Sequence, residues 1–382
     1  MATLKRYLSP AGATGRLLIA LVGLVAAFAV IGLVGEFRAT QLASMAYLGI
    51  AAAGLTVLTG LNGQLSLGHG AFMAIGAYTA ALLLPDADAA VPLPVVLLLA
   101  TAVTVLVGAL VGVAAARLHG PYLAGATLAL AVAVPGLAIY FGGTLGGEQG
   151  LSVAVPEVPA WFADQVFFLT GTDPSRGRYV TYVAWLVLVL VLLVLANLSR
   201  SRTGRLWRAV RDDEIAAQLA GIDLARNRVL AFVVSAACAG LGGAVMALAV
   251  RITAPSGFTI TLSLTLVAAI VLGGLGSLSG ALIGAALLTF LPQVVTQLGG
   301  DLGLDDVQSA QLAPLVYGVV MVLVVLLAPA GLVGSLQRWR LQRAGRRAAA
   351  AAGERATPSE ATETSPEPSS STSTQPTPRG AH

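Results

Sequence analysis

Polar side chains interrupt a long apolar stretch between residues 60 and 78. Two amides, a hydroxyl and an imidazole occur there, at Asn62, Gln64, Ser66 and His69. These groups can exchange hydrogen bonds with a polar solute, and the surrounding glycines permit sharp backbone turns. In an apolar setting they must bond to one another, to the backbone or to water in a cavity. The pattern predicts either the lining of a translocation path or a helix–helix turn whose polar groups satisfy one another.

Charged and small residues form a second group between residues 199 and 228. Part of this segment, 205–220, is predicted to be helical, and Gly221 is placed to act as its C-cap. Solvation of a surface loop is one explanation of the charges. A short helix without a core of its own also suits a groove on a partner protein. In the second interpretation the contact residues are Arg208, Arg211, Asp213, Glu214, Ala216, Ala217 and Gly221.

The residues that catalysis or nucleotide binding would need are missing from the sequence. Lys5 is the one lysine and lies in no glycine-rich loop, so the chain has no GxxxxGK[ST] phosphate-binding loop. There is no HExxH, no GxSxG and no paired carboxylate arrangement for acid–base work. A single cysteine, Cys238, excludes a disulfide framework or a cysteine-rich metal site. We therefore predict no catalytic residue, no metal site and no directly bound cofactor, with any ATP used by partner subunits.

The elements that position these residues are predicted to be membrane-spanning helices. Of 382 residues, 57% are hydrophobic and 10% are charged, and the mean hydropathy is +0.85. A soluble domain carries roughly 25% charged residues, so lipid must be the solvent for most of this chain. Uncharged runs of about 17–25 residues predict an all-α polytopic membrane protein with ten spans. These are 17–35, 40–59, 68–84, 92–116, 121–141, 179–198, 228–250, 261–275, 280–298 and 313–334.

Arginine placement predicts the orientation of the spans. The arginine-rich segment 199–228 and the arginines after the last span are expected on the cytoplasmic side, and the acidic loops near Asp86 and Asp305 outside. Two crossings between 258 and 298 then satisfy every charge cluster and leave both termini cytoplasmic. The pI near 9.5 therefore reflects topology signals in a protein surrounded by lipid, and nucleic acid is not an expected partner.

The predicted division of the chain follows from these spans. It comprises a cytoplasmic N-terminus (1–16), a transmembrane domain (17–338) with an external loop (142–178) and a cytoplasmic coupling loop (199–228), and a disordered cytoplasmic tail (339–382). A cleavable signal peptide is the alternative for the first span. Its apolar run continues unbroken to Gly35, which favours an uncleaved helix.

Small residues and a short span mark places where helices are expected to pack closely. The span 261–275 is short, and either a full crossing or a broken, re-entrant helix fits it. Glycines at a spacing of four residues are typical of close helix contacts, although a glycine-rich chain also produces such spacings by chance. The predicted packing positions are Gly108, Gly112, Gly276, Gly280 and Gly284.

The interiors of the proposed spans carry no Asp, Glu, Lys or Arg. Proton-coupled transporters usually keep an intramembrane carboxylate, because buried charge is expensive and is retained for use. The absence argues against proton coupling, and more weakly against sodium coupling through backbone carbonyls. Driving force would then come from another subunit. A secondary transporter or facilitator that works alone is the alternative.

Several stretches resemble those of one protein family and occur in the same order as in that family. The segment 60–78 looks like the signature of LivM-type branched-chain amino acid permeases of ABC transporters. The other matching stretches are 204–222, 231–240, 272–284 and 146–151, so that the resemblance covers roughly residues 40–335. In one departure, Thr127-Leu128-Ala129 leads to Val132 and Pro135 where the family often has an acidic residue.

The resemblance implies the permease subunit of an importer in a bacterial inner membrane. Glu214-Ile215-Ala216-Ala217 with Gly221 resembles the EAA loop that docks into the ATPase subunit. The family implies a second, homologous permease, two cytoplasmic ABC ATPases and an external solute-binding protein. It also implies branched-chain amino acids or similar small solutes as cargo. Urea and amide permeases are similar to this group, and they are the alternative for the substrate.

Overall fold

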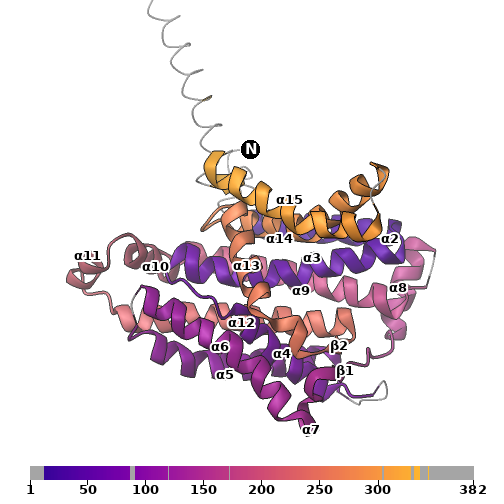
Figure 1. The fold of residues 1–382 in the computed structure, drawn as a ribbon, viewed down its shortest axis with the longest axis horizontal. Helices are drawn as coiled ribbons and strands as arrows, with labels where there is room; N and C mark the ends of the chain where they lie inside the picture. The colour runs from indigo at the N-terminus through magenta and orange to yellow at the C-terminus, as the bar shows by residue number, and fades with distance from the viewer. Residues whose placement is uncertain are drawn as a thin grey trace, which may run out of the picture. The chain divides into compact units, whose positions relative to one another are not determined.

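The protein is all-α in the part of the chain that the computed structural model describes, apart from two short strands (Figure 1). That part is residues 13–86, 91–118, 120–171, 173–302, 305–327, 331–335 and 343. The first half contains α2 (Ala13–Leu33), α3 (Glu36–Leu55), η1 (Thr56–Leu61), α4 (His69–Leu83), α5 (Leu93–Ala115), α6 (Pro121–Tyr140), α7 (Gly142–Leu145), η2 (Gly147–Gln149), β1 (Leu151–Ser152) and α8 (Ala160–Thr170). The second half contains α9 (Arg176–Arg200), α10 (Arg202–Asp212), α11 (Glu214–Leu219), α12 (Leu224–Val250), β2 (Ile252–Thr253), η3 (Pro255–Phe258), α13 (Ile260–Gly273), α14 (Leu278–Asp301) and α15 (Asp306–Leu327).

Helix lengths and hydropathy confirm a polytopic membrane protein. Eight of the described helical segments are long and apolar enough to cross a membrane. Every predicted span overlaps a helix, including the pair α13 and α14 that the charge argument required. However, α4 has only 15 residues and α15 is outside the eight. The count of ten, the orientation and the domain boundaries therefore stay predictions. The predicted tail, 339–382, lies outside the described residues except for Arg343, and so do residues 1–12 of the predicted N-terminus.

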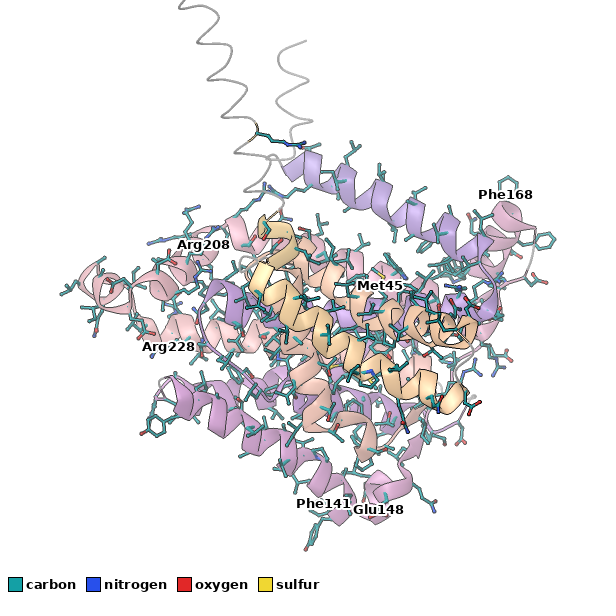
Figure 2. The ribbon with its side chains drawn as sticks, turned by 45° about the horizontal axis from the view of Figure 1, so that its top comes forward. Met45, Phe141, Glu148, Phe168, Arg208 and Arg228 are labelled. Carbon is teal, nitrogen blue, oxygen red and sulfur yellow. The ribbon has the colours of Figure 1, made fainter. Side chains whose placement is uncertain are left out.

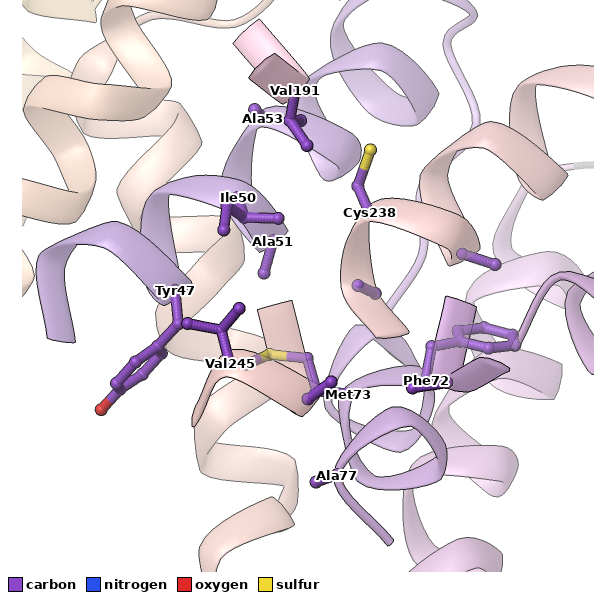
Figure 3. Packing of buried hydrophobic residues seen from close by; sticks show 14 of the residues in the cluster. Tyr47, Ile50, Ala51, Ala53, Phe72, Met73, Ala77, Val191, Cys238 and Val245 are labelled. Carbon is purple, nitrogen blue, oxygen red and sulfur yellow. The ribbon is translucent and has the colours of Figure 1, made fainter. Parts of the chain in front are cut away.

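The core forms where α3, α4 and α12 meet, because small residues let these helices approach closely. A Cβ added to Gly76 of α4 would lie 2.0 Å from the carbonyl oxygen of Gly240 on α12. At Gly243 of α12 it would lie 1.9 Å from the carbonyl oxygen of Met73. Figure 3 shows the side chains that fill the remaining space, with Met73 of α4 close to Val245 of α12. Packing between backbones therefore holds the centre together.

The glycines predicted to pack helices lie at close contacts. An added Cβ at Gly108 would meet the Ala236 side chain at 2.5 Å, and one at Gly284 would meet the Ala269 carbonyl oxygen at 2.1 Å. Gly112 faces Phe232, and Gly280 faces Gly273. Gly276 lies between α13 and α14, outside both predicted spans, and packs on η1: a Cβ added to Gly60 would lie 2.3 Å from the backbone nitrogen of Gly276. Its φ of +83° places it in the turn before α14, since the left-handed region suits glycine.

The two ends of the helices carry different side chains. Arg208 and Arg228 lie at the left in Figure 2, Phe168 lies at the right, and Phe141 and Glu148 lie at the bottom. At the end of α12 opposite Arg228, β1 and β2 pair antiparallel, with Leu151 opposite Thr253. Arg176, Arg178 and Arg251 also lie at this second end, so which end is cytoplasmic stays a prediction.

Candidate translocation path and coupling segment

The polar segment predicted from the sequence is a break between two helices. α3 continues as one turn of π-helix, η1, before the chain leaves helical geometry at Asn62 and enters α4 at His69. A π-turn in a helix is frequent at functional sites. Gly63 has a φ of +80°, which a residue with a side chain rarely adopts. Gly68 packs so closely on α6 that an added Cβ would lie 2.6 Å from the Thr127 carbonyl oxygen.

The break is buried among helices although its residues are polar. Asn62, Gln64, Ser66 and His69 are each at most 6% exposed. The Gln64 side-chain amide donates to the Asn62 side-chain carbonyl at 2.5 Å and to the Arg228 backbone carbonyl at 3.1 Å. The Ser66 hydroxyl accepts from the backbone N–H of Gly68 at 3.4 Å. Hydrogen bonds therefore connect residues within the break and connect the break to α12.

Hydroxyl groups on two other helices bind the backbone of the break. The Thr127 hydroxyl on α6 accepts from the N–H of Leu67 at 3.0 Å. The Ser263 hydroxyl on α13 accepts from the N–H of Gly70 at 2.9 Å. Sequence reasoning assigned these residues no such role. Their signal was a small hydroxyl side chain inside an apolar span, which must find a partner in that setting.

Some polar atoms at the break have no hydrogen-bond partner within the described part of the chain. They include Nδ2 of Asn62, Oε1 of Gln64 and Nε2 of His69, and also the hydroxyl of Thr56 on η1. A self-satisfied turn would pair such atoms, because each unpaired buried group costs about 1–3 kcal/mol. Both the path and the turn interpretations nevertheless stay predictions.

The predicted coupling segment differs from the single helix expected over 205–220. Asp213 adopts an extended conformation (φ −157°, ψ 108°) and divides the segment into α10 and α11. Its carboxylate accepts from the N–H of Ala216 at 2.9 Å and so caps α11. The sequence signal for this break was an aspartate three residues before Ala216, a position that suits an N-cap. Gly221 ends α11 as predicted, at φ +79°.

Two contacts join the coupling segment to the polar break. From α10, the Arg211 guanidinium donates to the carbonyl oxygen of Gly60, at the end of η1. From α11, Glu214 forms an ion pair with Arg228 of α12, whose side chain is only 7% exposed. The backbone carbonyl of Arg228 accepts the hydrogen bond from Gln64. Both halves of the segment are therefore connected to the break within one or two residues.

The remaining residues of the segment divide into anchored and exposed groups. Trp207 is fully buried and its indole N–H donates to the Asn227 backbone carbonyl at 3.1 Å, which fixes α10 to α12. The sequence analysis did not predict this anchoring role, although a single tryptophan among arginines indicated a buried position. Arg208 bonds to the carbonyls of Ser199 and Gly204 within its own corner. Ala217 is buried and Ala216 is exposed. α11 lies at the margin of the helices in Figure 1.

Comparison with known proteins identifies the family. A model described as the branched-chain amino acid transport system permease component matches residues 37–325. The chain belongs to this family. This confirms the resemblance seen in the sequence.

Relatives within the family cover most of the chain. It is 34% identical over 296 residues to the high-affinity branched-chain amino acid transport system permease protein LivM of Escherichia coli. The aligned region covers 73% of this chain and 66% of that protein. The chain is 29% identical over 300 residues to LivH of Escherichia coli, with 74% and 90% covered. It is 27% identical over 291 residues to BraD of Pseudomonas aeruginosa, with 74% and 90% covered. The chain thus spans just under two thirds of the length of the LivM protein.

Proposed function

We propose that the chain is the membrane-spanning permease subunit of an ABC importer in a bacterial inner membrane. In this proposal it moves branched-chain amino acids or similar small solutes, with ATP hydrolysed by partner subunits. Family membership supports the permease role, and the names of the relatives support the solute class. The absence of a phosphate-binding loop from the sequence supports the division of labour.

The solute path runs past the polar break. Unpaired atoms of Asn62, Gln64 and His69 can exchange hydrogen bonds with a solute that has left water. Leu65 is 44% exposed within the same irregular segment. Irregular backbone at membrane depth must be covered by protein or line a water-filled path. A second permease packed on this face would enclose such a path.

The connection between the coupling segment and the break is the observation that carries the proposal. α11 presents Ile215 and Leu219, which are 74% and 85% exposed and one helical turn apart. A six-residue helix with an apolar edge suits a groove on an ATPase. Movement of α11 would reach the break through Glu214 and Arg228, and movement of α10 would reach it through Arg211. Alternating access follows if the break has two positions.

The partners proposed are a homologous permease, two cytoplasmic ABC ATPases and an external solute-binding protein. Similarity of this chain to both LivM and LivH of one organism supports a permease pair built from related chains. The exposed edge of α11 supports an ATPase contact. The outer segment around β1 and α8 would face the binding protein.

The test is co-purification followed by transport. A tag on this chain should recover ATPase subunits, and the complex in proteoliposomes with its binding protein should take up labelled leucine only with ATP. Ile215→Glu with Leu219→Glu should release the ATPase, because a charge replaces apolar contact area. Gln218→Glu adds one of these two negative charges to α11 without removing an apolar side chain, and should keep the ATPase bound.

Two results would overturn the proposal. Concentrative uptake by the chain alone, without nucleotide, would show a secondary transporter. Equal loss of ATPase binding in the Gln218→Glu control would show that added negative charge, and not the loss of apolar contact area, releases the ATPase. Competition with urea, acetamide and leucine distinguishes the substrate classes.

A further inference from the structure

A cleft of about 510 Å³ lies between α2, α9 and α14. Its walls are apolar along most of their length, with Ile19 and Gly23 from α2, Leu188 and Leu192 from α9, and Leu282 from α14. This is the size range of a ligand site rather than of a packing defect, since small-molecule sites measure about 300–1,000 Å³. The polar break, α10 and α11 contribute no residue to its described lining, which includes Arg200 at the end of α9.

The polar side chains of the cleft all lie at one end. Arg16 lies in the first turn of α2, Arg200 ends α9 and Ser279 lies in the first turn of α14. The Arg16 guanidinium donates to the Asn197 side-chain carbonyl at 2.8 Å, which holds it beside the end of α9. α9 continues from this end into the arginine-rich segment, so the polar mouth of the cleft lies at the expected cytoplasmic surface.

α2 is supported in a way that keeps the cleft open. It contacts α9 near its start through Arg16, and near its other end Phe28 packs on Tyr182 with ring centroids 4.7 Å apart. Between these points, an added Cβ at Gly23 would meet no atom within 4 Å. The helix is therefore held at both ends while its middle faces open space.

We propose that this cleft binds a membrane glycerophospholipid with an anionic headgroup. Two arginines and a hydroxyl at the mouth match a phosphate diester, and the apolar walls below them match an acyl chain. Residues 1–12 are a poorer occupant, because they carry Lys5 and Arg6 and no acidic residue, so that like charges would meet at the mouth. A helix of a second permease would satisfy the apolar walls but not the arginines.

The test is native mass spectrometry of the purified transporter complex, titrated with phosphatidylglycerol and with phosphatidylcholine of identical chains. The parent should prefer phosphatidylglycerol. Arg16→Gln with Arg200→Gln should weaken that lipid by roughly 30-fold, since each basic side chain near an anionic headgroup contributes about fivefold. A control with Arg202→Gln and Arg226→Gln loses the same charge at two positions that do not line the cleft, and should keep the preference.

Gly23→Phe tests the apolar part of the cleft. The variant keeps both arginines and fills the space beside α2, so it should weaken the binding of both lipids. It tests the cleft independently if the double arginine variant folds poorly. Equal loss of preference in the two double variants would overturn the inference, because general surface charge would then explain the binding. Undiminished lipid binding in Gly23→Phe would overturn it as well.

Discussion

Arg211→Gln is expected to separate ATP hydrolysis from solute movement. The substitution removes the guanidinium that donates to the Gly60 carbonyl but keeps a long polar side chain on α10. A hydrogen bond from a charged group contributes about 1.5–3 kcal/mol. The Arg211 side chain is 41% exposed, so the lower end applies. If the break has two positions and the Arg211 hydrogen bond forms in only one, a loss of about 1.5 kcal/mol lowers the equilibrium constant for that position by about tenfold.

The measurement is the ratio of labelled leucine taken up to phosphate released, in proteoliposomes that contain the complex and its binding protein. We expect the ratio to fall by about tenfold, with hydrolysis close to the parent rate because the nucleotide site lies in another subunit. Arg205→Gln is the matched control: Arg205 donates to the Arg200 carbonyl, within the α9–α10 corner. An unchanged ratio in Arg211→Gln, or an equal fall in Arg205→Gln, would refute the reasoning.

Three other substitutions or labels test separate features. Glu214→Gln should lower the free energy of unfolding in detergent by about 1–2 kcal/mol, because it removes the half-exposed carboxylate that pairs with the buried Arg228. The Glu214→Gln/Arg228→Met double variant should lose less than the sum of the two single variants, and additive losses would contradict the pairing. Gly284→Ala should cost about 1–3 kcal/mol because its Cβ would lie 2.1 Å from a carbonyl oxygen on α13. Gly136→Ala, which meets no atom within 4 Å, should be neutral. A cysteine at Asp305 should react with impermeant reagents from outside; reaction only from the cytoplasm would contradict ten spans.

The helices of this protein were predictable because lipid restricts what a chain can do. A segment in hydrocarbon must satisfy its backbone internally, so an uncharged run of sufficient length becomes a helix. The two crossings between 258 and 298 followed from charge placement alone, and the structure has α13 and α14 there. Hydropathy did not decide whether the short α4 counts as a crossing, because its length of 15 residues is below what a bilayer requires.

The candidate site was predictable in composition but not in its contacts. Polar residue types identified 60–78 and the acidic and basic types identified 199–228, yet nothing in the spacing indicated that Arg211 reaches Gly60 across 151 positions. Such a bond depends on how α10 sits against η1, which is a tertiary property. The division at Asp213 was missed for a different reason, since helix propensity along the segment masked a capping residue.

The contacts also bear on why the break keeps its polar residues. Gln64 is bonded through one end of its amide to Asn62 and to the Arg228 carbonyl, whereas its Oε1 has no partner among the described residues. The hydrogen bonds of the Gln64 NH₂ group fix the direction of its Oε1. A buried oxygen without a partner lowers stability unless a bound solute or water donates a hydrogen bond to it during transport. The same Arg228 receives Glu214 from α11. The half-satisfied amide is therefore held by the helix that the coupling segment would move, which a simple turn between two helices would not require.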